Sequence, residues 1–330
     1  MTMNLPDGTK AFLEQAGWGA AKVDPLPGDA SFRRYFRVSM SGKNAMLMHA
    51  PAPHEDPQPF LKAAKWLAGE GHRSPGILAE DIAQGFVLQE DFGNYRMRDW
   101  LDDNPHAEER AYREALNALL KLRQSPAGPF APYDIDTYLR EVMLFPEWYC
   151  ASIGQKVDEA GFVAAWKAAL ASLSDGHHPV TVLRDYHAEN IMLLNPQEDG
   201  GTEQGLIDFQ DALVGNPAYD LVSLLQDARR DVSPELERAM IDYYLARSGD
   251  DKSVFEADYA LLGAQRNTKI VGIFARLCKR DGKTRYLGMI PRVWDALERD
   301  LAHPALQPVA EWFDLSIPRK IRDNSGGDLM

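Results

Sequence analysis

The first part of the chain alternates hydrophobic and polar positions in the manner of short strands. Phe32, Phe36 and Val38 share one face at a spacing of two, which predicts a strand entered from a turn at 28–31. A second turn, at 41–44, leads to the hydrophobic run 45–49, so these two runs are expected to form a hairpin. The rest of this region predicts the helices 10–17 and 60–69 and the strands 77–82 and 85–90.

From Tyr95 onward the hydrophobic spacing becomes that of helices. Helices are predicted over residues 134–152, 157–174, 219–228, 234–247 and most of 255–302. Three short hydrophobic runs interrupt this pattern and predict strands at 179–183, 191–194 and 205–207. The pattern therefore predicts an α+β protein, with a small antiparallel sheet near the N-terminus and a mainly helical remainder.

Length and charge limit the classes of function. A chain of 330 residues suggests two domains or lobes, and the change of pattern places them at 1–92 and 93–330. The net charge of −13, without a basic block, argues against nucleic acid and against an anionic membrane surface. No apolar run approaches the roughly 20 residues of a membrane span, and the polar N-terminus does not resemble a secretory signal. With only two cysteines, a cytoplasmic protein is expected.

One cluster of polar residues suggests phosphoryl transfer. Asp185 and Asn190 lie in a loop that ends in a hydrophobic strand, and Asp208 follows the next strand. A hairpin would bring Asn190 and Asp208 together as oxygen ligands of Mg²⁺, while Asp185 would accept the proton of an attacking hydroxyl. The simpler alternative, a polar loop whose Asp and Asn side chains cap turns, is weakened by the two strands. The sequence therefore predicts a kinase-type site.

These residues resemble the catalytic motifs of the aminoglycoside phosphotransferase and choline kinase-like family, which are small-molecule relatives of protein kinases. The resemblance implies a protein kinase-like fold in which an N-lobe, 1–92, binds ATP and a C-lobe, 93–330, carries catalysis. It assigns Asp185 as the catalytic base and Asn190 and Asp208 as Mg²⁺ ligands. It also implies that Asp220 supports the catalytic loop by hydrogen bonds.

Four longer strings are similar to a narrower group, the bacterial cell-wall amino-sugar anomeric kinases: 28–37, 183–187, 207–215 and 219–232. Members of this group phosphorylate N-acetylmuramate and N-acetylglucosamine at C1. The resemblance implies an ATP-dependent step of peptidoglycan recycling, with a small amino sugar as the partner. We expect a monomer.

The chain departs from kinases in lacking the ion pair between an N-lobe Lys and a helix Glu. The second strand, 45–49, has no phosphate-binding Lys, and the following helix has no acidic residue between 57 and 69. Arginines beside the 28–31 loop are the expected replacements, because one guanidinium group can donate two hydrogen bonds to phosphate oxygens. By the family resemblance, the backbone near 89–91 pairs with adenine. The predicted nucleotide-binding residues are Ser31, Arg33, Arg34, Gln89, Glu90 and Asp91, with Arg37 as a further candidate.

The acceptor pocket is less well defined by the sequence. Asp211 and His187 are predicted to contact the substrate, and the helical part offers further candidates in Tyr186, Glu147, Trp148, Arg266 and Asn267. Three other functions remain open. The acidic net charge would suit a kinase for a cationic alcohol such as an aminoglycoside, choline or homoserine. The missing Lys–Glu pair would suit a nucleotide-binding pseudokinase. A metal hydrolase would use His187 together with Asp185 and Asp208.

Overall fold

The structure is a computed structural model that describes residues 4–27, 32–173 and 178–327. The backbone forms two compact units. The first unit comprises Met1–Glu114 and Asn190–Ala212, and the second comprises Ala115–Glu189 and Leu213–Met330. The predicted division into a nucleotide-binding lobe, 1–92, and a catalytic lobe, 93–330, concerns function. It is not tested by these units and stays a prediction. Among the described residues, no helix has both the length and the apolar character that a membrane span needs.

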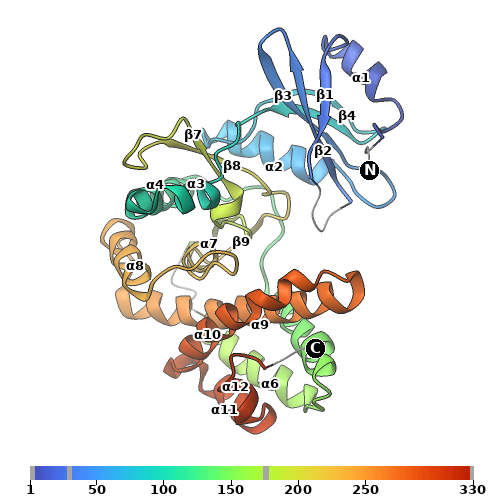
Figure 1. Ribbon diagram of the computed structural model, residues 1–330. Coiled ribbons are helices and arrows are strands. Elements are labelled where there is room, and N and C mark those ends of the chain that lie inside the picture. Colours follow the sequence, from blue (N-terminus) through green and yellow to red (C-terminus); the bar gives the residue numbers. More distant parts are fainter. Residues whose placement is uncertain (1–3, 28–31, 174–177, 328–330) are drawn as a thin grey trace. The chain divides into compact units, whose positions relative to one another are not determined.

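Figure 1 shows the antiparallel sheet of the first unit. Its five strands have the spatial order β1-β2-β3-β5-β4. Its strands are β1 (Lys22–Pro25), β2 (Arg34–Met40), β3 (Lys43–His49), β4 (Ile77–Asp81) and β5 (Phe86–Glu90). The predicted hairpin is confirmed as β2 and β3, and the two further predicted strands are confirmed as β4 and β5. β1 was not predicted, because four residues that include a proline are too short to show an alternating pattern.

Helix α1 (Thr9–Gln15) lies beside this sheet (Figure 1). Residues of α1 and of one face of the sheet form a hydrophobic core. Phe12 of α1 stacks on Phe86 of β5, with 5.2 Å between the ring centroids. The buried residues of this core are Phe12, Leu13, Phe36, Val38, Ala45, Leu47, Phe86 and Leu88. Because side chains alternate along a strand, Tyr35 and Arg37 of β2 lie on the opposite face.

Helix α2 (Gln58–Gly69) confirms the helix predicted at 60–69. Its face with Phe60, Leu61, Ala63, Ala64 and Leu67 is buried. Phe60, in the first turn, stacks on Phe209 with 5.2 Å between ring centroids. Since Phe209 follows Asp208 directly, this stack ties the start of α2 to the segment that carries the predicted metal ligand.

A two-stranded hairpin in the first unit carries the predicted metal ligands at one end. Strands β7 (Ile191–Leu194) and β8 (Glu203–Leu206) pair antiparallel, as the sequence predicts. The amide of Ile207 donates a hydrogen bond to the carbonyl of Asn190 at 3.1 Å, which continues the pairing beyond the strands. The chain therefore places Asn190 at the entry of the hairpin and Asp208 at its exit.

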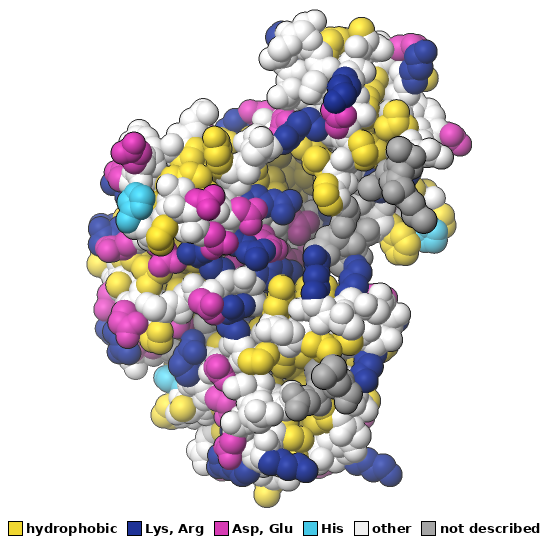
Figure 2. All heavy atoms as spheres, in the orientation of Figure 1, with side chains coloured by type: hydrophobic (Ala, Val, Ile, Leu, Met, Phe, Trp, Pro, Cys, Tyr) yellow, Lys and Arg dark blue, Asp and Glu magenta, His cyan; other side chains and the backbone are white. Residues whose placement is uncertain are grey.

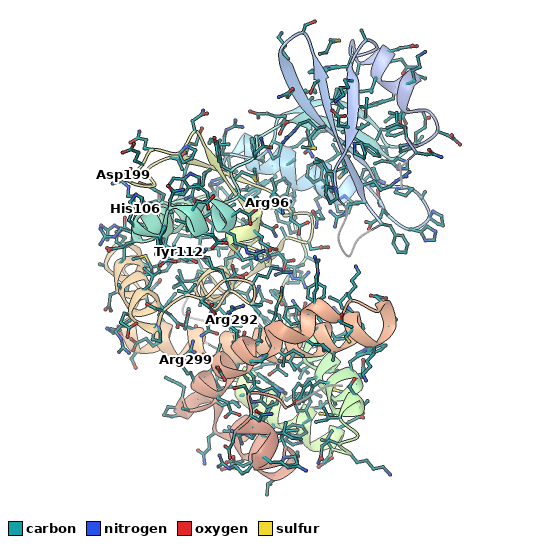
Figure 3. All side chains as sticks on the ribbon, in the orientation of Figure 1. Arg96, His106, Tyr112, Asp199, Arg292 and Arg299 are labelled. Atoms are coloured by element: carbon teal, nitrogen blue, oxygen red, sulfur yellow. The ribbon has the colours of Figure 1, made fainter. Side chains whose placement is uncertain are left out.

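Helices α3 (Met97–Asp103) and α4 (Glu108–Leu122) follow β5 along the chain. Between them, His106 fastens the turn at the far end of the hairpin, since its Nε2 lies 2.9 Å from the carbonyl oxygen of Glu198. His106 and Asp199 of the same turn lie near one another in Figure 3.

The second unit is mainly helical, as predicted. Its helices are α5 (Ile135–Val142), α6 (Glu159–Leu170), α7 (Ala218–Leu225), α8 (Pro234–Ser248), α9 (Lys252–Asp281), α10 (Ile290–Leu301), α11 (Gln307–Ser316) and α12 (Arg319–Arg322). A small two-stranded sheet pairs β6 (Val180–Val182) with β9 (Leu213–Gly215). Helix α11 and the three-residue strand β9 were not predicted.

Two predicted helices are divided in the structure. The segment 134–152 forms α5 and a separate π-helix, Phe145–Cys150, with Pro146 in its first turn. The segment 255–302 is interrupted by a 3₁₀-helix, Thr284–Met289, between α9 and α10. Gly282 ends α9 with a φ of 68°, a left-handed conformation that glycine adopts without strain, and Pro291 lies in the first turn of α10.

A glycine also explains how closely α9 packs on the segment that follows α5. A Cβ added at Gly272 would lie 2.3 Å from the carbonyl carbon of Leu144, so only glycine permits this approach. The contact helps to fix α9, which carries charged residues that enter the site described below.

Candidate active site

The predicted catalytic loop lies in the second unit, between β6 and a 3₁₀-helix at Ala188–Asn190. The carboxylate of Asp220, on α7, accepts hydrogen bonds from the backbone amides of Leu183 at 2.7 Å and Arg184 at 2.8 Å. Arg184 has a φ of 70°, an uncommon conformation for a residue with a side chain. Asp220 therefore holds the backbone just before Asp185, which confirms the support role expected for it.

Asp185 lies among positive charges contributed by α9 and by its own loop. Burial alone would raise the pKa of Asp185, but the charges of Lys269 and Arg266 outweigh it and lower the pKa. The side chain is only partly buried. Asp185 is therefore an ionised carboxylate at neutral pH, which can accept a hydrogen bond from a substrate hydroxyl.

Glu141 of α5 organises these charges. Its carboxylate pairs with the guanidinium of Arg184 and, at 3.1 Å, with the ammonium of Lys269. Lys269 also lies 3.2 Å from the hydroxyl of Tyr219. Burial acts to raise the pKa of Glu141, but Lys269 and Arg184 lower it, so the carboxylate is ionised. The sequence did not reveal Glu141 or Lys269, because both lie far along the chain from the loop.

His187 is buried within the loop, with 3% of its surface exposed. Its Nε2 lies 3.1 Å from a guanidinium nitrogen of Arg229, which also pairs with Glu189 at 3.1 Å. Burial and the charge of Arg229 hold the pKa of His187 well below its usual value, so the ring is neutral and accepts a hydrogen bond from Arg229. The substrate contact predicted for His187 stays a prediction.

The predicted metal ligands lie in the first unit and contact each other. Asn190 donates a side-chain hydrogen bond to Asp208 at 3.3 Å. Asp208 has a φ of 60°, and its other carboxylate oxygen accepts a hydrogen bond from Gln210 at 3.0 Å. One amide and one carboxylate at the end of a hairpin are a typical donor set for Mg²⁺, which uses one or two protein oxygens together with substrate phosphates. The described residues contain no cluster of three or more His, Cys, Asp or Glu side chains suited to a metal.

The two arginines predicted to bind nucleotide point in different directions. Arg33 precedes β2 and lies 3.5 Å from Glu55 and 3.9 Å from Asp208. Arg34 lies on the other face of β2, beside His49 at 3.4 Å and over the ring of Phe36. Arg33 is therefore directed toward the predicted metal ligands, whereas the nucleotide contact of Arg34 stays a prediction. Ser31 lies outside the described residues.

Arg37, the further candidate for phosphate binding, is engaged elsewhere. Its guanidinium pairs with Asp91 at 2.6 Å and donates to the carbonyl of Gly93 at 2.9 Å and to Asn94. Arg37 thus joins β2 to the segment after β5.

The segment predicted to bind adenine has its acidic side chains occupied. Glu90 forms two hydrogen bonds with Arg73, at 2.7 and 2.5 Å, and these lower the pKa of Glu90. Asp91 is paired with Arg37. Gln89 is buried, and its carboxamide oxygen has no hydrogen-bond partner within the described parts of the chain. The backbone amide of Glu90 also donates a hydrogen bond to the carbonyl of Gly76 at 2.8 Å. The adenine contact predicted for this segment stays a prediction.

The residues suggested for the sugar pocket are mostly not exposed. Arg266 and Asn267 have 2% and 0% of their surface exposed, because they lie on the inner side of α9. Tyr186 is buried too, and its hydroxyl donates to the carbonyl of Ala115 at 2.8 Å. Asp211, in contrast, is exposed and lines a cavity.

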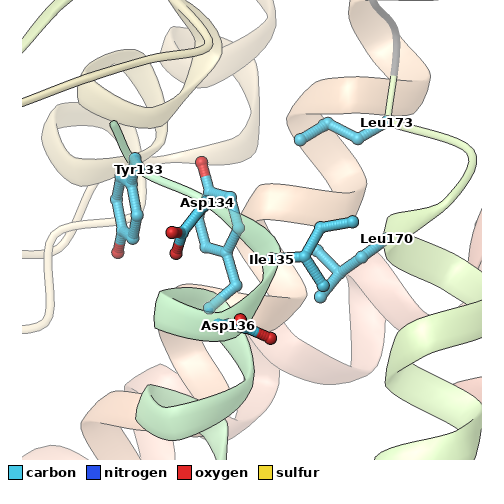
Figure 4. A pocket seen from close by; sticks show the side chains of 7 residues that line it. Tyr133, Asp134, Ile135, Asp136, Leu170 and Leu173 are labelled. Carbon is cyan, nitrogen blue, oxygen red and sulfur yellow. The ribbon is translucent and has the colours of Figure 1, made fainter. Parts of the chain in front are cut away.

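A cavity lies within the described residues of each unit. In the first, a cavity of about 480 Å³ is lined by Arg33, Pro53, His54, Glu55, Asp56, Pro59, Phe60, Gln210 and Asp211. In the second, a cavity of about 460 Å³ is lined by Tyr133, Asp134, Ile135, Asp136, Tyr138, Leu170 and Leu173 (Figure 4). Carboxylates beside stacked rings suit a ligand with hydroxyl groups.

On the face drawn in Figure 2, acidic and basic side chains are interspersed.

Comparison with known proteins identifies the class. The profile of the phosphotransferase enzyme family matches residues 22–256, and the chain belongs to this family. An N-acetylmuramate/N-acetylglucosamine kinase of Caulobacter vibrioides is 35% identical, over 94% of this chain and 96% of that protein. The protein of the same name from Pseudomonas aeruginosa is 38% identical over 89% of each chain.

Solved structures confirm the protein kinase-like fold predicted from the sequence. A choline/ethanolamine kinase family protein from Mesorhizobium loti superposes with a TM-score of 0.63 at 15% identity, covering 94% of this chain and 99% of that one. An ADP-bound aminoglycoside phosphotransferase superposes with a TM-score of 0.61 at 15% identity, covering 93% and 99%. At this level of identity the likeness concerns the fold.

Proposed function

We propose that this phosphotransferase transfers the γ-phosphoryl group of ATP to the anomeric C1 hydroxyl of N-acetylmuramate and N-acetylglucosamine, as a step of peptidoglycan recycling. The observation that carries the proposal is the name shared by relatives that are 33–38% identical over most of the chain. The complete set of Asp185, Asn190 and Asp208 supports it.

In this proposal Asp185 orients the C1 hydroxyl and accepts its proton. The carboxylate is suited to this role because Lys269 and Arg266 keep it ionised, and because Asp220 fixes the backbone beside it. Glu141 in turn holds Lys269 and Arg184 in place, so the loop is supported from both α5 and α9.

Asn190 and Asp208 are proposed to hold Mg²⁺. Both offer an oxygen atom, and the hairpin already brings their side chains into contact. Bound MgATP would supply the transferable phosphoryl group and a cation that offsets its charge. The segment from Gln89 to Asp91 is proposed to receive the adenine, as the family resemblance implies; the carboxylates of Glu90 and Asp91 are themselves paired with Arg73 and Arg37.

Asp211 is proposed to contact the acceptor sugar, since it is exposed beside Arg33 in the first-unit cavity. We further propose that the enzyme acts in the cytoplasm, where ATP is available, and that it acts as a monomer. Light scattering of the purified chain tests the monomer directly.

The substrate is tested by measuring ADP release with a panel of acceptors. N-acetylmuramate and N-acetylglucosamine should each stimulate ADP release, whereas their 1-O-methyl glycosides should not, because the anomeric oxygen is blocked. Choline, homoserine and an aminoglycoside belong in the same panel. Turnover of one of these alone would overturn the substrate, and tight ATP binding without turnover would favour a pseudokinase.

A further inference from the structure

We propose that Glu55 is a positioning residue that holds Arg33 toward the terminal phosphates of the nucleotide. The pair Arg33–Glu55 would then take the place of the Lys–Glu ion pair of protein kinases. The acidic member would come from the loop before α2 rather than from the helix itself. This inference rests on the proposed function only in that it requires a nucleotide; it does not depend on the acceptor.

The contacts of Arg33 define a direction. Its Nε lies 3.5 Å from Oε2 of Glu55, and its Nη1 lies 3.9 Å from Oδ1 of Asp208. A guanidinium is planar, so a carboxylate held at Nε restricts the rotation of the whole group. Glu55 therefore turns the far edge of the guanidinium toward Asp208, the proposed Mg²⁺ ligand.

Both members of the pair are largely shielded from water. The side chain of Arg33 is 14% exposed and that of Glu55 is 21% exposed. An interaction between partly buried charges is screened less than one at the surface, so the pair can hold a defined geometry. Burial acts to lower the pKa of Arg33, but Tyr35, Asp208 and Glu55 outweigh it, and the guanidinium stays charged.

A second contact fastens the same two segments. Phe32 stacks on His54, with 4.8 Å between ring centroids and 21° between the ring planes. Two consecutive residues just before β2, Phe32 and Arg33, thus contact two consecutive residues of the loop before α2. The first contact is the ring stack and the second is the ion pair. The cavity lined by Arg33 and Glu55 opens beside this double contact.

The other candidate arginines are placed differently. Arg34 faces His49 on the opposite side of β2, and Arg37 is bound to Asp91. Within the described part of the chain, Arg33 is the one of these three arginines that forms an ion pair with Asp208. Arg33 is therefore the residue whose position agrees with phosphate binding next to a metal.

The test measures nucleotide binding without acceptor. Affinities for Mg²⁺ with a non-hydrolysable ATP analogue, and for Mg²⁺ with ADP, are compared by calorimetry in the wild type, Arg33→Gln, Glu55→Gln and the double variant. Glu80→Gln is the control, because Glu80 forms an exposed ion pair with Lys65 in the same unit. Thermal unfolding of each variant reports whether it folds.

We expect Arg33→Gln to weaken binding of the ATP analogue about 10-fold or more, as for a lost charged hydrogen bond, with a smaller effect on ADP. Glu55→Gln should weaken binding of the analogue by less, and should add nothing in the Arg33→Gln background. The control should bind as the wild type does.

Three results would overturn the inference. These are wild-type affinity in Glu55→Gln, an equal loss from Glu55→Gln with and without Arg33, and equal losses for the ATP analogue and ADP. Failure of the proposed function gives a different result, namely normal nucleotide binding in the wild type without phosphorylation of either sugar.

Discussion

The side-chain amide of Asn190 donates a hydrogen bond to Asp208 at 3.3 Å, although 18 residues separate the two along the chain. The intervening residues form a closed hairpin, and its turn is fastened at the far end by His106. Because pairing in a hairpin is fixed by register, any residue at its entry meets the residue at its exit. The hairpin thus brings together the two side chains that are proposed to hold Mg²⁺.

This pairing predicts that kcat and the Mg²⁺ requirement depend strongly on the carboxylate of Asp208. Asp208→Asn replaces the carboxylate that is proposed to bind Mg²⁺ by a neutral amide, so we expect kcat to fall about 10²-fold or more. The Mg²⁺ concentration for half-maximal rate should rise. Rates measured over a Mg²⁺ titration check both effects, with Asp199→Asn, on the turn of the same hairpin, as the control. A Mg²⁺ dependence equal to that of the wild type would refute the assignment of Asp208 as a ligand.

The charge of Lys269 predicts a shift in the pH profile. Lys269 is the largest positive influence on Asp185, where it opposes burial and lowers the pKa. Lys269→Met should therefore raise the pKa of Asp185, and the acid limb of kcat/KM should move to higher pH. Lys269→Arg keeps the charge and should leave the limb near its wild-type position. An unchanged limb in Lys269→Met would show that Asp185 is not the group that titrates.

Asp220 predicts a pH dependence of stability. Burial raises the pKa of Asp220 to about 7, despite the hydrogen bonds from Leu183 and Arg184 that lower it. The folded protein therefore binds this proton more tightly than the unfolded chain does. Its contribution to the free energy of unfolding is fully present below the ordinary Asp pKa of 3.8 and is lost as the pH rises through about 7.

Asp220→Asn removes this titration. The free energy of unfolding of the wild type minus that of the variant should fall between pH 5 and pH 8, because other groups contribute equally to both proteins. Urea unfolding of the two proteins at several pH values measures this difference. A difference that stays constant or grows with pH would contradict the raised pKa.

The sequence predicted those parts of the site whose residues lie close together along the chain. The β2–β3 hairpin, the β7–β8 hairpin and the loop around Asp185 each depend on spacing within a few tens of residues. Strand β1 and strand β9 were missed because so few residues show no periodicity. The break between α9 and α10 was missed because Gly282 was not recognised as a helix end.

The charged support of the site could not be predicted in the same way. Glu141 and Lys269 are 128 residues apart, and nothing in either helix alone indicates that their charged positions meet. Glu55 was missed for another reason. Kinases carry the acidic partner on the helix itself, whereas Glu55 precedes the first residue of α2.

The most direct test of the account is ³¹P NMR of the chain with ATP, Mg²⁺ and N-acetylmuramate or N-acetylglucosamine, for the wild type and Asp185→Asn. Asp103→Asn, at an exposed position on α3, is the matched control. We predict a sugar 1-phosphate resonance with the wild type and the control. Asp185→Asn should form it about 10²–10⁴-fold more slowly, while binding the ATP analogue nearly as well. Absence of a sugar phosphate with the wild type, or an undiminished rate in Asp185→Asn, would contradict the account.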